Sequence, residues 1–227
     1  MNYEIGLEKL SLALIAQLIK NNTRLKLSDL AVERIQKCRK YLDDKLSTNG
    51  DPIYGINTGF GYLQHIKIES ENLTQLQHNL LLSHACGTGQ EVPKEIVKTM
   101  LLLKVQSLSY GHSAVALATV QRLIDFYNND ILPVIYTQGS LGASGDLAPL
   151  AHLTIPLIGE GEVWYKNERI TAAELNAKFG WDALMLQSKE GLALINGTQF
   201  MSAYGVHCLI KAQEFSAWAD AIAAIAI

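Results

Sequence analysis

Residues 139–150, Gly-Ser-Leu-Gly-Ala-Ser-Gly-Asp-Leu-Ala-Pro-Leu, restrict the possible folds of this chain more than any other stretch. Glycine occupies positions 139, 142 and 145, and a glycine backbone can adopt positive φ angles and turn tightly. Asp146 follows at once, and a short acidic side chain ahead of an apolar run is typical of a helix N-cap. The pattern predicts a tight turn that leads directly into a helix.

The helix predicted after this turn begins at Leu147. Pro149 is compatible with its first turn, because the N–H that proline lacks would have no partner inside the helix at that point. We therefore expect Ala143-Ser144-Gly145 to be held in a strained conformation at the positive end of a helix.

Common types of glycine-rich loop fit this segment poorly. A phosphate-binding loop of the G-x-x-x-x-G-K-[ST] type needs a lysine, and none lies between Arg122 and Lys166. A hydrolase nucleophile elbow, G-x-S-x-G, needs glycine where Asp146 stands. Two interpretations stay open, namely a purely structural loop and a loop that modifies itself.

Self-modification has a simple chemical basis in this segment. Gly145 has no side chain that would block its amide nitrogen from reaching the carbonyl carbon of Ala143. Loss of water from this ring closure, and of the Ser144 hydroxyl as a second water, would give a five-membered imidazolone that carries an exocyclic methylidene. Such a group is an electrophile made from the backbone itself.

Three other segments contain residues that could carry chemistry. Tyr54–Gly61, Tyr-Gly-Ile-Asn-Thr-Gly-Phe-Gly, is either a mobile surface loop or a lid that carries a phenol. His84, near the end of a predicted helix, is either a capping or buried histidine or a substrate contact. Asn196-Gly197 is either a plain turn or part of a site.

Together these segments resemble the motifs of the aromatic amino acid ammonia-lyases. Gly142–Leu150 resembles the prosthetic-group signature of that family. Tyr54–Gly61, Ser83–Gly89 and Asn196–Thr198 resemble three further motifs in the same order along the chain. One glycine-rich match alone would say little, whereas four collinear matches extend over almost the whole chain. Within the family, the histidine-specific members are the most similar.

The resemblance implies a set of catalytic residues. Ala143-Ser144-Gly145 would form the methylidene-imidazolone, and Asn196 would hydrogen-bond to this group and to the substrate. Tyr54 would act as the catalytic base, for which its reference pKa near 10 must be lowered by neighbouring groups. The helix that begins after Asp146 would favour negative charge on the imidazolone oxygen by a few tenths to about 1 kcal/mol.

The resemblance also implies residues that bind the substrate or support the loop. His84 would contact the ring of the substrate, and Gly61, at the end of the Tyr54 motif, is assigned to substrate binding. Asp146 and Leu147 would support the modified tripeptide. The resemblance implies no metal ligand.

The activity implied by the resemblance is elimination of ammonia from L-histidine to give trans-urocanate. It would need no diffusible cofactor, and the enzyme would be a homotetramer in which each active site draws on three subunits. The alternatives are a tyrosine ammonia-lyase or an aromatic aminomutase, and a non-catalytic helical protein that keeps the loop for packing. A fumarase-like lyase without the imidazolone is disfavoured by the Ala-Ser-Gly loop.

The expected fold is mainly α and, by resemblance, of the fumarase/aspartase-like helical superfamily. We expect helices over 7–20 and from Gln199 onward, a hairpin over 159–170, and a capping box at Thr171–Glu174. By resemblance, residues 1–197 form an N-terminal domain and 198–227 begin a central helical bundle. Because the last helical run has no Gly, Pro or basic residue to end it, the chain is expected to be a truncated fragment. The resemblance implies that further active-site residues lie in a second half of the protein, so the fragment would be inactive alone.

Composition indicates neither a nucleic acid nor a membrane as a partner. The net charge is −3, 18% of the residues are charged, and lysines and arginines form no cluster. The apolar C-terminal run is too short to span a membrane and is interrupted by Asp220. Cys38, Cys86 and Cys208 lie far apart without metal-ligand spacing, as expected of reduced thiols in a cytoplasmic protein.

The self-modifying loop makes a prediction about the mass of the polypeptide. If the loop cyclises, the intact mass falls below that of the sequence by two waters, and the deficit maps to a peptide that contains Ala143–Gly145. The measurement is made on residues 1–227 and on the whole protein. An unmodified mass in both would contradict self-modification, whereas a deficit in the whole protein alone would show that cyclisation needs more chain.

Overall fold

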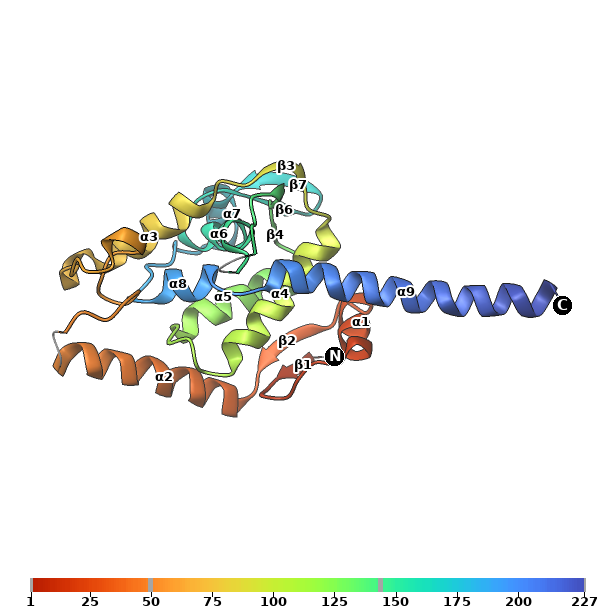
Figure 1. The fold of residues 1–227 in the computed structure, drawn as a ribbon, viewed down its shortest axis with the longest axis horizontal. Coiled ribbons are helices and arrows are strands. Elements are labelled where there is room, and N and C mark those ends of the chain that lie inside the picture. The colour runs from red at the N-terminus through yellow and green to blue at the C-terminus, as the bar shows by residue number, and fades with distance from the viewer. Residues whose placement is uncertain (1, 49–50, 143–144, 227) are drawn as a thin grey trace.

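The computed structural model describes residues 2–48, 51–142 and 145–226, and it is mainly helical, as the sequence predicts (Figure 1). The α-helices are α1 (Leu12–Lys20), α2 (Asp29–Thr48), α3 (Leu73–His84), α4 (Lys94–Ser109), α5 (Leu117–Asn128), α6 (Leu147–Thr154), α7 (Ala172–Phe179), α8 (Glu190–Ile195) and α9 (Gln199–Ala226). Short 3-10 helices are η1 (Gly61–Leu63), η2 (Ser70–Asn72) and η3 (Ile155–Ile158). The strands are β1 (Asn2–Ile5), β2 (Arg24–Leu27), β3 (Thr88–Glu91), β4 (Leu132–Pro133), β5 (Tyr136–Gln138), β6 (Glu162–Tyr165) and β7 (Glu168–Thr171).

The core is built around α4. Twelve of its 16 residues are buried, so the helix is covered on nearly every side. It packs against α5 and α9 and also contacts α1 and α2. Met100, Leu101 and Leu102 are fully buried, and burial of such side chains stabilises the fold by about 1.5–3 kcal/mol each. Side chains on α4 therefore reach several other elements from within the core.

Within the described ranges the strands form three small sheets, and most of them are labelled in Figure 1. β1 pairs with β2 in parallel, β3 pairs with β5 antiparallel, and β6 lies between β4 and β7. The pairing of β3 with β5 matters most for the site, because β3 follows His84 and β5 precedes the glycine turn. It brings two of the sequence motifs side by side.

The helix predicted over 7–20 begins only at Leu12. Ser11 caps it by accepting a hydrogen bond from the N–H of Leu14 at 3.2 Å. The residues before α1 form β1, which pairs with β2 in the segment after α1. The register places Asn2 opposite Arg24. Sequence periodicity misses this strand because its partner is distant in the chain.

The hairpin predicted over 159–170 is confirmed by β6 and β7. Its turn residues Lys166 and Asn167 have φ angles of +49° and +64°. The capping box before α7 is also confirmed, since the Thr171 side chain accepts from the Glu174 N–H and the Glu174 carboxylate accepts from the Thr171 N–H. The bonds from the Thr171 backbone and side chain hold the pKa of the Glu174 carboxyl below its usual value.

The long helix predicted from Gln199 is α9, which begins against α4 and α1 and then leaves the body of the molecule (Figure 1). Residues 211–226 are all exposed, including the large apolar side chains of Phe215, Trp218 and Ile222. No helix within the described ranges combines the length and apolar character needed to cross a bilayer. The division into domains over 1–197 and 198–227 stays a prediction.

The capping box provides a test of the fold. Replacing Thr171 by Ala removes the side chain that accepts from the Glu174 N–H, and we expect a loss of about 1 kcal/mol in the free energy of unfolding, measured by urea denaturation. Thr137→Ala, at an exposed position on β5, is the matched control and should change it by less than about 0.5 kcal/mol. Equal effects of the two substitutions would contradict the assigned role of the cap.

Candidate functional site

The glycine turn is present between β5 and α6. Gly139, Gly142 and Gly145 have φ angles of +142°, +70° and +95°, in the range that the sequence predicts for them. Gly142 and Gly145 pair with each other as an antiparallel bridge, so the two ends of the turn lie side by side. Ala143 and Ser144, both predicted to belong to the prosthetic group, lie outside the described residues.

Gly145 packs directly on the Asn196–Thr198 segment. A Cβ at Gly145 would lie 2.5 Å from the carbonyl oxygen of Gly197, closer than any real side chain could stand. Next to it, the Asp146 N–H donates to the same Gly197 oxygen at 2.8 Å. The structure therefore brings together two motifs that lie about 50 residues apart in the sequence.

Asp146 stands at the predicted N-cap position of α6, but its side chain caps a different helix. The carboxylate makes no capping bond to α6. Instead it accepts from the N–H of Met201, in the first turn of α9, at 2.9 Å and from the Ser140 hydroxyl at 3.0 Å. Asp146 is 2% exposed, so this buried charge ties the turn to α9 and corrects the sequence prediction.

A pocket of about 220 Å³ opens between the end of α3 and the start of α6. Its walls come from the Ser83–Gly89 motif, from the glycine turn and from Leu147, the first residue of α6. Its lining residues are Ser83, His84, Cys86, Gly139, Leu141, Gly145, Leu147 and Ala148. Three of the predicted site residues, His84, Gly145 and Leu147, thus share one small cavity.

His84 is the last residue of α3 and is half-buried at the pocket wall. Its Nδ1 lies 2.9 Å from the carbonyl oxygen of Leu80. A carbonyl can only accept, so Nδ1 carries the proton and donates. In the neutral ring, Nε2 is then the nitrogen with a free lone pair, and the imidazole can accept a hydrogen bond from a ligand.

The structure adds His152, which the sequence did not single out. This residue of α6 is buried, and its Nε2 accepts a hydrogen bond from the Gly87 N–H at 2.9 Å. Its ring packs edge-on against Tyr136 with centroids 5.2 Å apart, and burial lowers its pKa. His152 thereby fixes the backbone after His84 against the helix that follows the glycine turn.

Tyr54 and Gly61 do not line this pocket. The Tyr54 side chain is 57% exposed, and its ring contacts Phe60 edge-on at 6.2 Å between centroids. Gly61 is exposed and begins η1. The loop itself is anchored, because a Cβ at Gly55 would lie 2.5 Å from the Leu192 side chain on α8. Of the described residues, Gly145 lines the pocket and Tyr54 does not.

Asn196 is the C-cap residue that follows α8, and it is exposed. Its backbone N–H donates to Leu192, and the chain then turns into Gly197. The side chain of Asn196 is not part of the pocket lining, although its neighbour Gly197 touches Gly145. The structure therefore places the Asn196 segment beside the turn and leaves the side-chain amide accessible.

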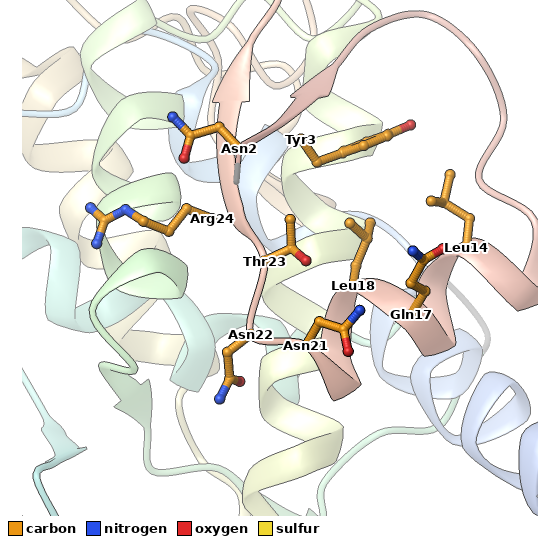
Figure 2. A pocket seen from close by; sticks show the side chains of 9 residues that line it. All are labelled: Asn2, Tyr3, Leu14, Gln17, Leu18, Asn21, Asn22, Thr23 and Arg24. Carbon is orange, nitrogen blue, oxygen red and sulfur yellow. The ribbon is translucent and has the colours of Figure 1, made fainter.

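The described residues also contain a hollow that is separate from the sequence motifs. No three His, Cys, Asp or Glu side chains within the described ranges lie close enough to hold a metal ion. A hollow of about 490 Å³ lies between β1, β2 and α1 (Figure 2). It is lined by Asn2, Tyr3, Leu14, Gln17, Leu18, Asn21, Asn22, Thr23 and Arg24, and includes none of the motif residues.

Comparison with known proteins gives a consistent result. The model of the family described as aromatic amino acid lyase matches residues 10–227. The chain is 44% identical over 218 residues to a histidine ammonia-lyase of Deinococcus radiodurans, and the match covers 96% of this chain and 41% of that protein. The chain thus spans about two fifths of the length of that curated relative.

Solved structures agree with the sequence comparison. Histidine ammonia-lyase from Trypanosoma cruzi matches with a TM-score of 0.86 and 34% identity, over 95% of this chain and 42% of that chain. Tyrosine aminomutase from Streptomyces globisporus matches with a TM-score of 0.84 and 32% identity, over 91% of this chain and 38% of that chain. Both similarities extend over nearly all of this chain.

The buried contact of His152 predicts a pH dependence of stability. Its pKa is below the usual 6.5, so between the folded-state pKa and about 6.5 the unfolded chain binds more protons than the folded one. The contribution of His152 to stability is therefore complete above about pH 6.5 and is lost as the pH falls below it. His152→Gln, which keeps an acceptor but does not titrate, should flatten this part of the curve of unfolding free energy against pH.

The matched control is His65→Gln, at an exposed position away from this contact. It should keep the pH dependence of the wild type. If the curves of the His152→Gln and wild-type proteins stay parallel from pH 7.5 to 5, His152 is not the responsible group.

Proposed function

This chain belongs to the aromatic amino acid lyase family, and on that premise we propose that the whole protein eliminates ammonia from L-histidine to give trans-urocanate. The family resemblance of the sequence motifs is confirmed by the match over residues 10–227. The observation that carries the proposal is the pocket where His84 meets Gly145. The 44% identity to a histidine ammonia-lyase supports the choice of substrate.

The proposed prosthetic group is a methylidene-imidazolone made autocatalytically from Ala143-Ser144-Gly145. The surroundings fit this group, because Gly142 and Gly145 pair across the turn and Gly145 has no room for a Cβ beside Gly197. Once formed, it supplies an electrophile that makes the substrate amine a better leaving group. No diffusible cofactor enters this proposal.

The residues of the chain would orient the substrate and move its proton. His84 offers Nε2 as an acceptor to an N–H on the substrate ring, because its Nδ1–H is engaged with Leu80. The exposed amide of Asn196 would donate a hydrogen bond near the modified turn. Tyr54 would remove the β-proton as a phenolate, and Gly61 would lie against the bound substrate.

Tyr54 would reach the site from another copy of the chain. It is 57% exposed and does not line the pocket of its own chain. The exposed apolar side chains of Phe215, Trp218 and Ile222 on α9 provide a surface for association. We therefore propose a homotetramer with shared active sites. We also propose a cytoplasmic location, with no nucleic acid or membrane partner. Residues 1–227 alone would then be inactive.

A second candidate is an aminomutase, favoured by the similarity to the tyrosine aminomutase structure. Such an enzyme would return ammonia to the β-carbon of the substrate. The acceptor on His84 does not exclude it, since a phenol O–H can donate to Nε2 as an imidazole N–H can. The two candidates differ in their products.

Turnover by the whole protein tests the proposal. We expect urocanate to form from L-histidine, followed by its ultraviolet absorbance, with little product from L-tyrosine. Tyr54→Phe should lower kcat by about 100-fold or more while the two-water mass deficit remains, because it removes a proton acceptor and not the prosthetic group. Tyr62→Phe, a neighbouring substitution at a residue that is 97% exposed, is the control and should leave kcat unchanged.

Other products would decide between the alternatives. A β-amino acid would identify an aminomutase, and a cinnamate-type product from L-tyrosine would identify a tyrosine lyase. An unmodified turn together with no turnover would favour a non-catalytic protein that keeps the turn for packing.

A further inference from the structure

Lys104 is a buried lysine that has no role in the proposed mechanism. It lies on α4 and is 1% exposed. No ion pair of the described residues includes it. A buried ammonium without a carboxylate is costly, so its other polar contacts must compensate.

Those contacts are two carbonyl groups at the end of α8. The Nζ of Lys104 donates to the Ala193 oxygen at 2.8 Å and to the Asn196 oxygen at 3.3 Å. Carbonyls in the last turn of a helix have no intrahelical partner and carry partial negative charge. Lys104 thus satisfies and fixes the end of α8 from within the core.

The same segment supports the glycine turn. Asn196 is followed directly by Gly197, whose oxygen accepts from the Asp146 N–H at 2.8 Å and touches Gly145. A continuous path therefore runs from the Lys104 ammonium through the Asn196 carbonyl to the turn. A shift of the end of α8 would move both the Asn196 amide and the surface on which Gly145 rests.

We propose that Lys104 is a positioning residue of the site: its Nζ–H groups hold the end of α8 so that Asn196 and Gly197 stay in place against Gly145. Its effect on catalysis rests on the proposed lyase function, whereas its effect on the turn does not. Burial lowers the pKa of Lys104 to about 7. Both the ammonium and the neutral amine have at least two N–H donors, so the two bonds can form in either state.

Lys98 provides a matched control on the same helix. It is also buried, at 7% exposed, but its Nζ donates to Asn22 at 2.8 Å and pairs with Asp130, away from α8. Lys98→Met and Lys104→Met therefore each remove a buried lysine Nζ and its hydrogen bonds from the same helix. Only the second removes the contacts to the end of α8.

The experiment compares these variants in the whole protein by hydrogen exchange at the Asp146 amide, intact mass and steady-state kinetics. Lys104→Met should speed exchange at Asp146 by about fivefold or more, as expected when a supporting hydrogen bond is lost. It should lower kcat by about 10- to 100-fold with KM within about twofold, because the reacting groups are displaced. Lys98→Met should leave the exchange rate at Asp146 and kcat unchanged. Lys104→Arg keeps N–H donors at this position and should recover most of the wild-type exchange rate and kcat.

The proposal would be overturned if Lys104→Met and Lys98→Met gave equal exchange rates at the Asp146 amide and equal kcat values. If Lys104→Met does not fold, Lys104→Gln and Lys98→Gln make the same comparison, and equal exchange at Asp146 in these two proteins would also overturn it. A wild-type protein without the two-water deficit and without turnover would refute the proposed function. The exchange comparison would still decide the role of Lys104.

Discussion

The contact between Gly145 and Gly197 is the constraint on which the site depends. Two backbones approach so closely there that a single Cβ would lie 2.5 Å from an oxygen. Beside the contact, Asp146 donates its N–H to Gly197 and accepts from the Met201 N–H with its carboxylate. One residue thus connects the glycine turn, the segment after α8 and the start of α9. The turn is held by this bonding as well as by its own glycines.

Buried polar side chains support that contact from behind. Lys104 bonds the carbonyls at the end of α8, and His152 accepts from the Gly87 N–H beside the pocket. Both side chains bind backbone groups, and both come from helices whose other residues pack in the core. Each of these polar contacts is buried, so water competes little for it and the hydrogen bonds are stronger than at the surface.

Other residues named in the sequence motifs, and the outer part of α9, are exposed. Tyr54 and Asn196 are exposed, and the outer part of α9 presents apolar side chains to solvent. The chain also spans only 41% of the length of a histidine ammonia-lyase with which it shares 44% identity. Within the described residues, the turn is thus held by buried contacts, whereas Tyr54, Asn196 and the outer part of α9 are exposed.

The sequence by itself determined the local features of this protein. The glycine spacing of the turn, the capping box at Thr171 and the long helix from Gln199 depend on neighbouring residues, and local preferences are strong there. The four collinear motifs also identified the family. Only the tertiary structure decided which motifs meet, because contacts such as Gly145 with Gly197 join residues far apart in the chain. The sequence could not predict several other contacts for the same reason, because each depends on a partner that only packing brings close. They are the pairing of β1 with β2, the capping of α9 by Asp146, and the hydrogen bonds of Lys104 and His152.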